Sequence, residues 1–213
     1  MLSVQKWHNE QLAEITVGAL KKNGFDAEYF TNSKDAVDSV LSLITSGMTI
    51  GFGGSATVKG LNVAEKAAEL GAVILDHNVP ELSAEEKLEV RRKQLTSDIF
   101  LCSSNALTLD GYLVNVDGTG NRVAAMSFGP KKVIVLAGVN KICKDTEAGF
   151  ARIELSAAPK NTNRLNLKTP CATTGVCADC NSEKRICRIY SVLKKKPSAA
   201  DFKVIIVGET LGY

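Results

Sequence analysis

Aromatic residues are scarce in this 213-residue chain, at 6% of its composition and with a single tryptophan. Its basic C-terminal part therefore offers few rings on which bases could stack, and we do not expect it to bind nucleic acid. The chain has no apolar run near the roughly 18 residues of a membrane span, and its start lacks the basic and apolar zones of a secretory signal. We therefore expect a cytoplasmic protein with no membrane span and with reduced cysteines.

The chain also lacks a large excess of charge of either sign, since its net charge is only +3. Apolar residues make up 45% of it. These values exclude a disordered chain, and the length predicts a single domain over residues 1–213. The charge is unevenly divided. Residues 1–151 carry 15 Lys and Arg against 18 Asp and Glu, whereas residues 152–213 carry 11 against 5. Four of the six cysteines lie in this basic part.

Helical and strand patterns alternate along much of the chain. Strands are predicted at 26–30, 48–52, 72–75, 99–102, 111–116, 131–138, 188–193 and 202–207. Helices are predicted up to Asn23-Gly24, at 33–44, from 55 to about 70, at 83–95 and at 145–158. This rhythm predicts an α/β fold with a mostly parallel sheet and helices on both faces. The strand at 111–116 ends in a turn signal, so we expect it to pair antiparallel with a neighbour.

A cysteine-rich loop over residues 168–188 has no periodicity and needs something other than an apolar core to order it. Its spacing is Cys171-x5-Cys177-x2-Cys180-x6-Cys187. A Cys-x2-Cys pair places two thiolates on one turn, and two flanking cysteines complete a tetrahedral set, so we expect a metal site. The gaps match neither the common ferredoxin nor the zinc-ribbon pattern, so the spacing leaves iron–sulfur and zinc open.

A glycine-rich loop, Ile50-Gly-Phe-Gly-Gly-Ser-Ala-Thr57, joins a predicted strand to a predicted helix. Gly53 and Gly54 would let the backbone approach an anion closely, and Ser55 and Thr57 add hydroxyl groups. The alternative is a tight turn in which Ser55 is an ordinary helix cap. The Gly-Lys-Ser/Thr ending of a nucleotide P-loop is absent. The loop therefore indicates a small anionic ligand.

Polar residues are also dense after the predicted strand at 99–102, where α/β folds place ligand sites. The candidate ligand-binding residues of this region are Asn105, Gly111, Asn121 and Arg122. The guanidinium of Arg122 suits bidentate binding of a carboxylate or phosphate.

Two carboxylates are candidates for catalysis. Asp110 precedes Gly111 in the same polar region and is a candidate base, and Glu209 follows the last predicted strand. For Asp110 the alternative is a plain Asp-Gly turn, and we interpret Asp117-Gly118 as such a turn. Glu209 would more often be a surface group.

Several runs carry a resemblance to a known family. They are Asn105-Ala-Leu-Thr-Leu-Asp-Gly111, Leu113-Val-Asn-Val-Asp-Gly-Thr-Gly-Asn-Arg122, Phe128-Gly-Pro-Lys-Lys-Val133, Gly138-Val-Asn-Lys-Ile142, the cysteine loop and Gly208-Glu209-Thr-Leu-Gly212. Over essentially its whole length, the chain resembles the lactate-utilisation (LUD) domain family. The resemblance implies a fold similar to the ribose-5-phosphate isomerase and CoA-transferase group, with an α/β core.

The resemblance also implies a role in the oxidation of L-lactate to pyruvate, alongside iron–sulfur partner proteins. It favours a 4Fe–4S cluster in the cysteine loop, with zinc as the alternative. Related enzymes hold phosphate or CoA on a glycine-rich loop, here Gly53 to Thr57, and use an acidic residue at the carboxyl edge of the sheet, here Asp110 or Glu209. If the chain is an enzyme, it would be an oxidoreductase component of lactate oxidation.

Two other functions remain open at this point. The first is a stand-alone enzyme that acts on a sugar phosphate, a CoA thioester or a folate, as members of the wider fold group do. The second is a zinc-stabilised interaction module without catalysis. The sequence also leaves the oligomeric state open, with a homo-oligomer as one option.

Overall fold

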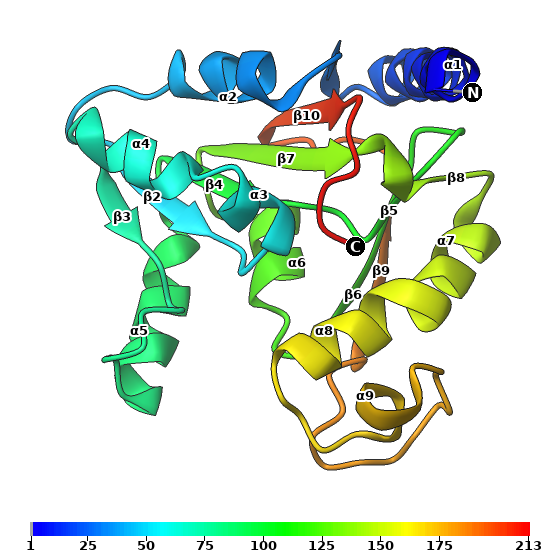
Figure 1. The fold of residues 1–213 in the computed structure, drawn as a ribbon. Coiled ribbons are helices and arrows are strands. Elements are labelled where there is room, and N and C mark those ends of the chain that lie inside the picture. The colour runs from blue at the N-terminus through cyan, green and yellow to red at the C-terminus, as the bar shows by residue number, and fades with distance from the viewer. Residues whose placement is uncertain (1) are drawn as a thin grey trace.

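A computed structural model describes residues 2–213, and its helices and strands alternate along most of the chain (Figure 1). The helices are α1 (Leu2–Lys22), α2 (Ser33–Leu41), α3 (Ala56–Gly60), α4 (Val63–Glu69), α5 (Ala84–Gln94), α6 (Asn121–Ser127), α7 (Thr146–Arg152), α8 (Ala158–Arg164) and α9 (Pro170–Thr174). The strands are β1 (Asp26–Phe30), β2 (Thr49–Phe52), β3 (Val73–Leu75), β4 (Ile99–Cys102), β5 (Ala106–Thr108), β6 (Leu113–Asp117), β7 (Lys132–Gly138), β8 (Ile142–Cys143), β9 (Ile189–Leu193) and β10 (Asp201–Val207).

Six strands form one sheet in the order β1-β10-β7-β4-β2-β3. Every pairing in this sheet is parallel, so the carboxyl ends of its strands all lie at one edge. Helices cover both of its faces. The predicted α/β fold with a mostly parallel sheet is confirmed.

The central strand β7 shows why the sheet is covered on both sides. Its side chains alternate between two apolar clusters, because successive residues of a strand point to opposite faces. Val133, Val135 and Ala137 pack with residues of α1 and α6 in one cluster. Ile134 and Leu136 pack with residues of α2, α3 and α4 in the other. A near-continuous apolar run is therefore the expected sequence for this strand.

A second sheet, which the sequence patterns did not predict, has the order β8-β5-β6-β9. Strand β6 pairs antiparallel with both β5 and β9, which confirms the expected antiparallel pairing of this segment. A separate apolar cluster joins the sheet to the α7–α8 segment through Ala106, Val114, Ile153 and Ala158. Figure 1 shows the small sheet and the α7–α8 segment beyond the carboxyl end of β7.

Two predicted helices differ from the observed ones. The helix expected from 55 to about 70 is divided into α3 and α4 at Asn62, whose φ of 51° is left-handed and does not continue a helix. The helix expected at 145–158 continues through a π turn at Ile153–Ala157 into α8. Its predicted cap is correct, since the carboxylate of Asp145 accepts a hydrogen bond from the backbone of Ala148. In the described part of the chain, each helix is either too short or too polar to cross a bilayer.

Candidate functional site

A polar cavity of about 260 Å³ lies at the carboxyl edge of the six-stranded sheet. Its walls include the residues that directly follow β2, β4 and β7, among them Gly53, Ser103 and Lys141. Residues of the small sheet and of α8, such as Val116 and Asn161, line it as well. Parallel strands end at a common edge, so residues far apart in the sequence meet here, where open α/β sheets bind ligands.

Most of the predicted ligand-binding residues line this cavity. They are Gly53, Gly54, Ser55, Thr57, Asn105, Asn121 and Arg122. The structure thus brings the glycine-rich loop and the polar region after β4 into one place. Their roles in binding remain predictions.

The glycine-rich loop also has a local structural role. Gly54 has a φ of +68°, a left-handed conformation that favours glycine. The hydroxyl of Ser55 accepts a hydrogen bond from the backbone N–H of Val58 and so caps α3. The helix-cap role that the sequence left open for Ser55 is therefore correct. Thr57 is the buried hydroxyl of the loop and donates to the carbonyl of Leu211.

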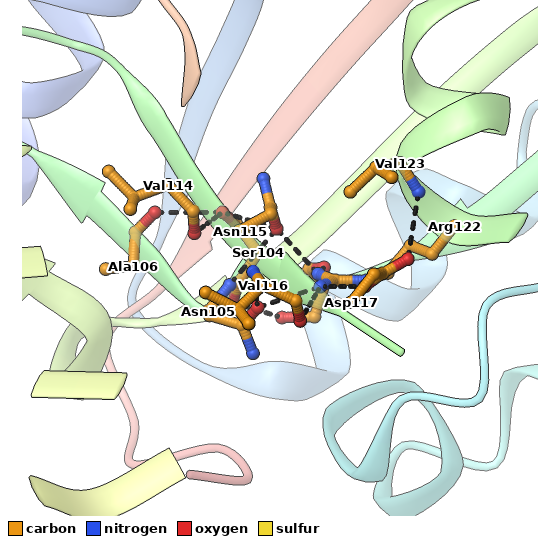
Figure 2. A network of polar contacts seen from close by, with 10 residues as sticks. Ser104, Asn105, Ala106, Val114, Asn115, Val116, Asp117, Arg122 and Val123 are labelled. Atoms are coloured by element: carbon orange, nitrogen blue, oxygen red, sulfur yellow. Dashed lines mark hydrogen bonds and ion pairs between the residues drawn. The ribbon is translucent and has the colours of Figure 1, made fainter. Parts of the chain in front are cut away.

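Arg122 is the centre of a buried polar network (Figure 2). Its guanidinium donates to the side-chain oxygens of Asn105 (2.8 Å) and Asn115 (2.6 Å) and to the carbonyl of Ser103 (2.6 Å). It also pairs with the carboxylate of Asp117 at 2.6 Å. All three guanidinium nitrogens thus donate within the protein. Arg122 holds the wall of the cavity in place, and a ligand would have to share its donors.

The carboxylate of Asp117 does more than the predicted turn requires. One oxygen accepts two hydrogen bonds from Arg122, and the other accepts from the backbone N–H of Val123 in the first turn of α6. Both side chains of the ion pair are only 10% exposed. Asp117 therefore neutralises a buried cation and fixes the start of a helix at the same time.

Lys141 projects its amine into the same part of the cavity. Its side chain is buried, and Nζ donates to the hydroxyl oxygens of Thr57 and Ser103, each at 2.9 Å. Burial, together with the positive charges of Arg152 and Arg122, lowers the pKa of Lys141 to about 7. The lysine is poised between its charged and neutral forms near neutral pH.

Positive charge outweighs negative charge around the cavity. Among the described residues that line it, the cationic side chains are Arg91, Arg122, Lys141 and Arg164. The single acidic side chain in this lining is Asp117, which is already paired with Arg122. An anionic ligand would supply the missing negative charge in a site that is partly shielded from water.

Both predicted catalytic carboxylates lie away from this cavity. Asp110 is exposed on the turn between β5 and β6, and its backbone carbonyl accepts a hydrogen bond from the Asn23 side chain at the end of α1. Glu209 follows β10 at the carboxyl edge of the sheet, but its carboxylate accepts a hydrogen bond from the backbone N–H of Ser33 in the first turn of α2. Neither side chain is among those that line the cavity. Their catalytic role stays a prediction without a contact to support it.

Gly111, a predicted ligand-binding residue, contacts α1 instead. A Cβ atom there would lie 2.5 Å from the backbone carbon of Ala19 and 2.5 Å from the backbone nitrogen of Leu20. Its φ of +74° is also left-handed. This glycine is required for close packing of the β5–β6 turn against α1.

The cysteine-rich loop brings all four of its cysteines to one place. A small cavity of about 20 Å³ is lined by Cys171, Cys177, Cys180 and Cys187. Burial, together with the other three cysteines, raises the pKa of Cys187 to about 11, as expected for thiols that lie close together. Within residues 2–213, however, no three His, Cys, Asp or Glu side chains are set in the geometry of a metal site.

The loop is ordered by backbone contacts and is attached to the polar cavity. The guanidinium of Arg185 donates to the carbonyls of Cys180 and Cys187, each at 2.7 Å. The backbone N–H of Arg188 donates to the carbonyl of Asp117 at 3.0 Å. Cys187 lines both cavities. The cysteine loop is therefore a direct neighbour of the Arg122 network.

Residues 13–207 match the model of the LUD domain family, which covers most of the chain. The chain belongs to the LUD domain family. No curated protein is a significant match to it.

One solved structure shares the fold of this LUD domain over most of its length. A DUF162 family protein from Deinococcus radiodurans is similar at a TM-score of 0.52 and 12% identity, with 93% of this chain and 98% of that chain covered. Ribose 5-phosphate isomerase from Plasmodium falciparum matches at a TM-score of 0.33 and 20% identity, over 53% of this chain and 52% of that chain. The eIF2B beta subunit of Chaetomium thermophilum matches at a TM-score of 0.35 and 15% identity, over 52% of this chain and 43% of that chain. At 12% identity, the first of these comparisons describes the fold alone.

Sequence reasoning missed several residues of the LUD cavity, and Lys141 is the most important of them. Arg91 and Arg164 on α5 and α8 and His77 after β3 also line it. One signal could have found Lys141, since it follows a predicted buried strand and belongs to the run Gly138–Ile142 that resembles the family. The arginines lie on helices far from the glycine-rich loop in the sequence, and no local pattern marks them.

Proposed function

We propose that this LUD chain binds a small organic anion in the polar cavity and serves as a component of an iron–sulfur system that oxidises L-lactate to pyruvate. The observation that carries the binding proposal is the buried amine of Lys141, whose hydrogen-bond acceptors are two hydroxyls. A carboxylate or phosphate beside it would favour the charged amine and relieve the cost of its burial.

The size and composition of the cavity support the same ligand class. A volume of about 260 Å³ is at the small end of protein ligand sites, which suits a metabolite of a few carbon atoms. The surrounding guanidinium groups of Arg91, Arg122 and Arg164 favour an anion over a neutral or cationic ligand. The hydroxyls of Thr57 and Ser103 add partners that can donate to or accept from a substrate hydroxyl or carbonyl.

The lactate part of the proposal rests on family membership and on the runs that resemble lactate-utilisation proteins. In this role, Cys171, Cys177, Cys180 and Cys187 would hold a 4Fe–4S cluster in their shared cavity. A bound cluster supplies one-electron transfer. Arg185, which contacts the carbonyls of two of these cysteines, would help to offset the negative charge of the thiolates.

Zinc is the second candidate for the cysteine loop, and the size of the small cavity favours it. A cavity of about 10–15 Å³ suffices for one water molecule, so about 20 Å³ has room for a single ion. A four-iron cluster would require the loop to open. With zinc bound, the loop would be a structural unit beside the anion cavity and would take no part in electron transfer.

A ligand panel tests the anion site. L-Lactate, pyruvate and inorganic phosphate are each added, and thermal unfolding is followed. A ligand at 100 times its dissociation constant adds about 2.7 kcal/mol of stability. We expect a stabilising anion for the wild type, a much smaller effect for Lys141→Met, and an unchanged effect for Lys34→Met, which removes the same charge from an exposed position on α2. If no anion stabilises the wild type, the binding proposal fails.

Two further measurements test the finer function. Metal and acid-labile sulfide analysis of protein prepared without oxygen distinguishes the two metal candidates. Iron with sulfide supports the iron–sulfur proposal, whereas zinc without sulfide overturns it and supports the second candidate.

In the native host, deletion of this chain should slow growth on L-lactate, and the wild-type chain should restore it. Unchanged growth would contradict the proposed role in lactate oxidation.

A further inference from the structure

Two buried lysines of this chain have opposite environments. Lys203 in β10 has a side chain that is 9% exposed, and its Nζ pairs with Asp26 at 2.9 Å and Glu28 at 3.0 Å. Lys141 is equally buried, yet its Nζ contacts the hydroxyls of Thr57 and Ser103. A carboxylate partner keeps a buried amine charged, whereas a hydroxyl partner does so far less. Lys203 is thus a structural ammonium group, and Lys141 is the buried lysine whose amine is available for chemistry.

The position of Lys141 also suits a nucleophile. It lines the cavity that is proposed to hold the anion, so a bound ligand would lie beside its amine. The guanidinium groups of Arg122 and Arg152 lie close enough to disfavour its protonation. A neutral lysine in a partly desolvated site next to other cations is the typical amine of Schiff-base chemistry. The two hydroxyls at 2.9 Å can pass protons to and from the reacting atoms.

We propose that Lys141 forms a Schiff base with a small aldehyde or ketone that carries a carboxylate or phosphate group. This inference rests on the proposed anion site, in which the lining guanidinium groups would hold the charged group of the ligand and leave its carbonyl beside Nζ. It extends that proposal by assigning a covalent step and a carbonyl to the ligand.

The step is balanced without an oxidant or reductant. The lone pair of Nζ forms a bond to the carbonyl carbon, and the π electrons of the C=O bond move to the oxygen, which takes up a proton. The nitrogen of the resulting carbinolamine releases a proton, and the carbon–oxygen bond then breaks as the nitrogen lone pair forms the C=N bond. The oxygen leaves as water after a second protonation, for which the hydroxyls of Thr57 and Ser103 are the nearest relays.

Reductive trapping tests the inference. The protein is incubated with sodium cyanoborohydride and one of three carbonyl compounds: pyruvate, dihydroxyacetone phosphate or acetone. The modified lysines are then identified by intact mass and peptide mapping. We expect a single adduct on the Lys141 peptide with pyruvate or with dihydroxyacetone phosphate, and no modification of the Lys203 peptide. The two anionic compounds distinguish a carboxylate site from a phosphate site, and acetone, which has no charged group, should label poorly.

Competition and substitution provide the controls. An anion without a carbonyl, L-lactate or inorganic phosphate, should slow labelling of Lys141 in the wild type, a result that needs no variant to fold. Lys141→Arg keeps the positive charge but should give no adduct. Adducts spread over exposed lysines, or labelling of Lys203 to the same extent as Lys141, would overturn the inference. If pyruvate or the phosphate stabilises the protein in the thermal assay and yet no adduct forms, the Schiff base is wrong while the proposed anion site stands. If neither binds, both fail.

Discussion

Removal of the Asp117 carboxylate should be among the most damaging single changes near the cavity. Asp117 and Arg122 are each 10% exposed and pair at 2.6 Å. The remaining acceptors of Arg122 are neutral: the carbonyl of Ser103 and the side-chain amides of Asn105 and Asn115. Asp117→Ala therefore leaves a buried guanidinium without a counter-charge.

The size of the effect follows from that uncompensated charge. Breaking a buried ion pair by removal of one partner costs about 3–5 kcal/mol. In addition, the backbone N–H of Val123 loses its acceptor at the start of α6. For a chain of this length, about 2–4 °C is lost per kcal/mol, so the unfolding midpoint should fall by on the order of 10 °C. Asp117→Asn keeps an oxygen for Arg122 and should lose less.

Urea unfolding followed by circular dichroism measures this difference. Asp38→Ala is the control, because it breaks an ion pair with Lys34 that lies on the exposed face of α2, and its midpoint should move far less than that of Asp117→Ala. If Asp117→Ala is too unstable to purify, Asp117→Asn gives the same comparison. A free energy of unfolding within about 1 kcal/mol of the wild type for Asp117→Ala would refute the view that Arg122 depends on this carboxylate.

Three other predictions concern packing, protonation and the metal. Gly111→Ala should destabilise the protein in urea unfolding by about 1–3 kcal/mol, because its Cβ would meet the backbone of α1. Gly18→Ala is the control: it lies inside α1 with open space around its Cβ and should stabilise the protein by about 0.5–1 kcal/mol. The pKa of Lys141 is about 7 in the folded protein, against 10.5 for an ordinary lysine. Between these two pH values the unfolded chain binds a proton that the folded protein does not. The free energy of unfolding should therefore rise with pH across this window, by up to about 1.4 kcal/mol per pH unit. Unfolding at about pH 6 and about pH 9 tests this, since Lys141→Met should lack the rise. Metal analysis of Cys187→Ser should show loss of most bound metal. An equal metal content in Cys187→Ser and the wild type would show that Cys187 is not a ligand. Cys143→Ser, outside the loop, is the control.

Local sequence patterns predict much of the fold. The apolar run of β7 predicts a strand that is buried on both faces, and the Asp145 cap predicts the start of α7. Both depend on neighbours in the chain. The small sheet was missed because β5 and β8 contain three and two residues, too few for a periodic pattern. These strands form because β6 and the α7–α8 segment lie beside them.

The candidate site was predictable to a similar degree. The glycine-rich loop carries a dense local signal, and Thr57 and Ser55 were found by it. The signal at Lys141, its place after a buried strand, is much weaker, because a lysine after a strand is usually a solvated surface group. Asp110 shows the opposite case, since Asp-Gly indicates a turn from local preference, and only the packing of that turn against α1 places the carboxylate outside the cavity.

The sequence by itself determined the alternation of helices and strands, the predominance of parallel pairing, the polar loops and the group of four cysteines. The tertiary structure decided which of these polar groups share a cavity and which are charged there. The physical reason is that hydrophobic periodicity acts between residues a few positions apart, whereas burial and electrostatics act between residues that only the folded sheet brings together. Lys141 owes its lowered pKa first to its burial, and then to the guanidinium groups of Arg152 and of Arg122, which is nineteen positions earlier in the sequence.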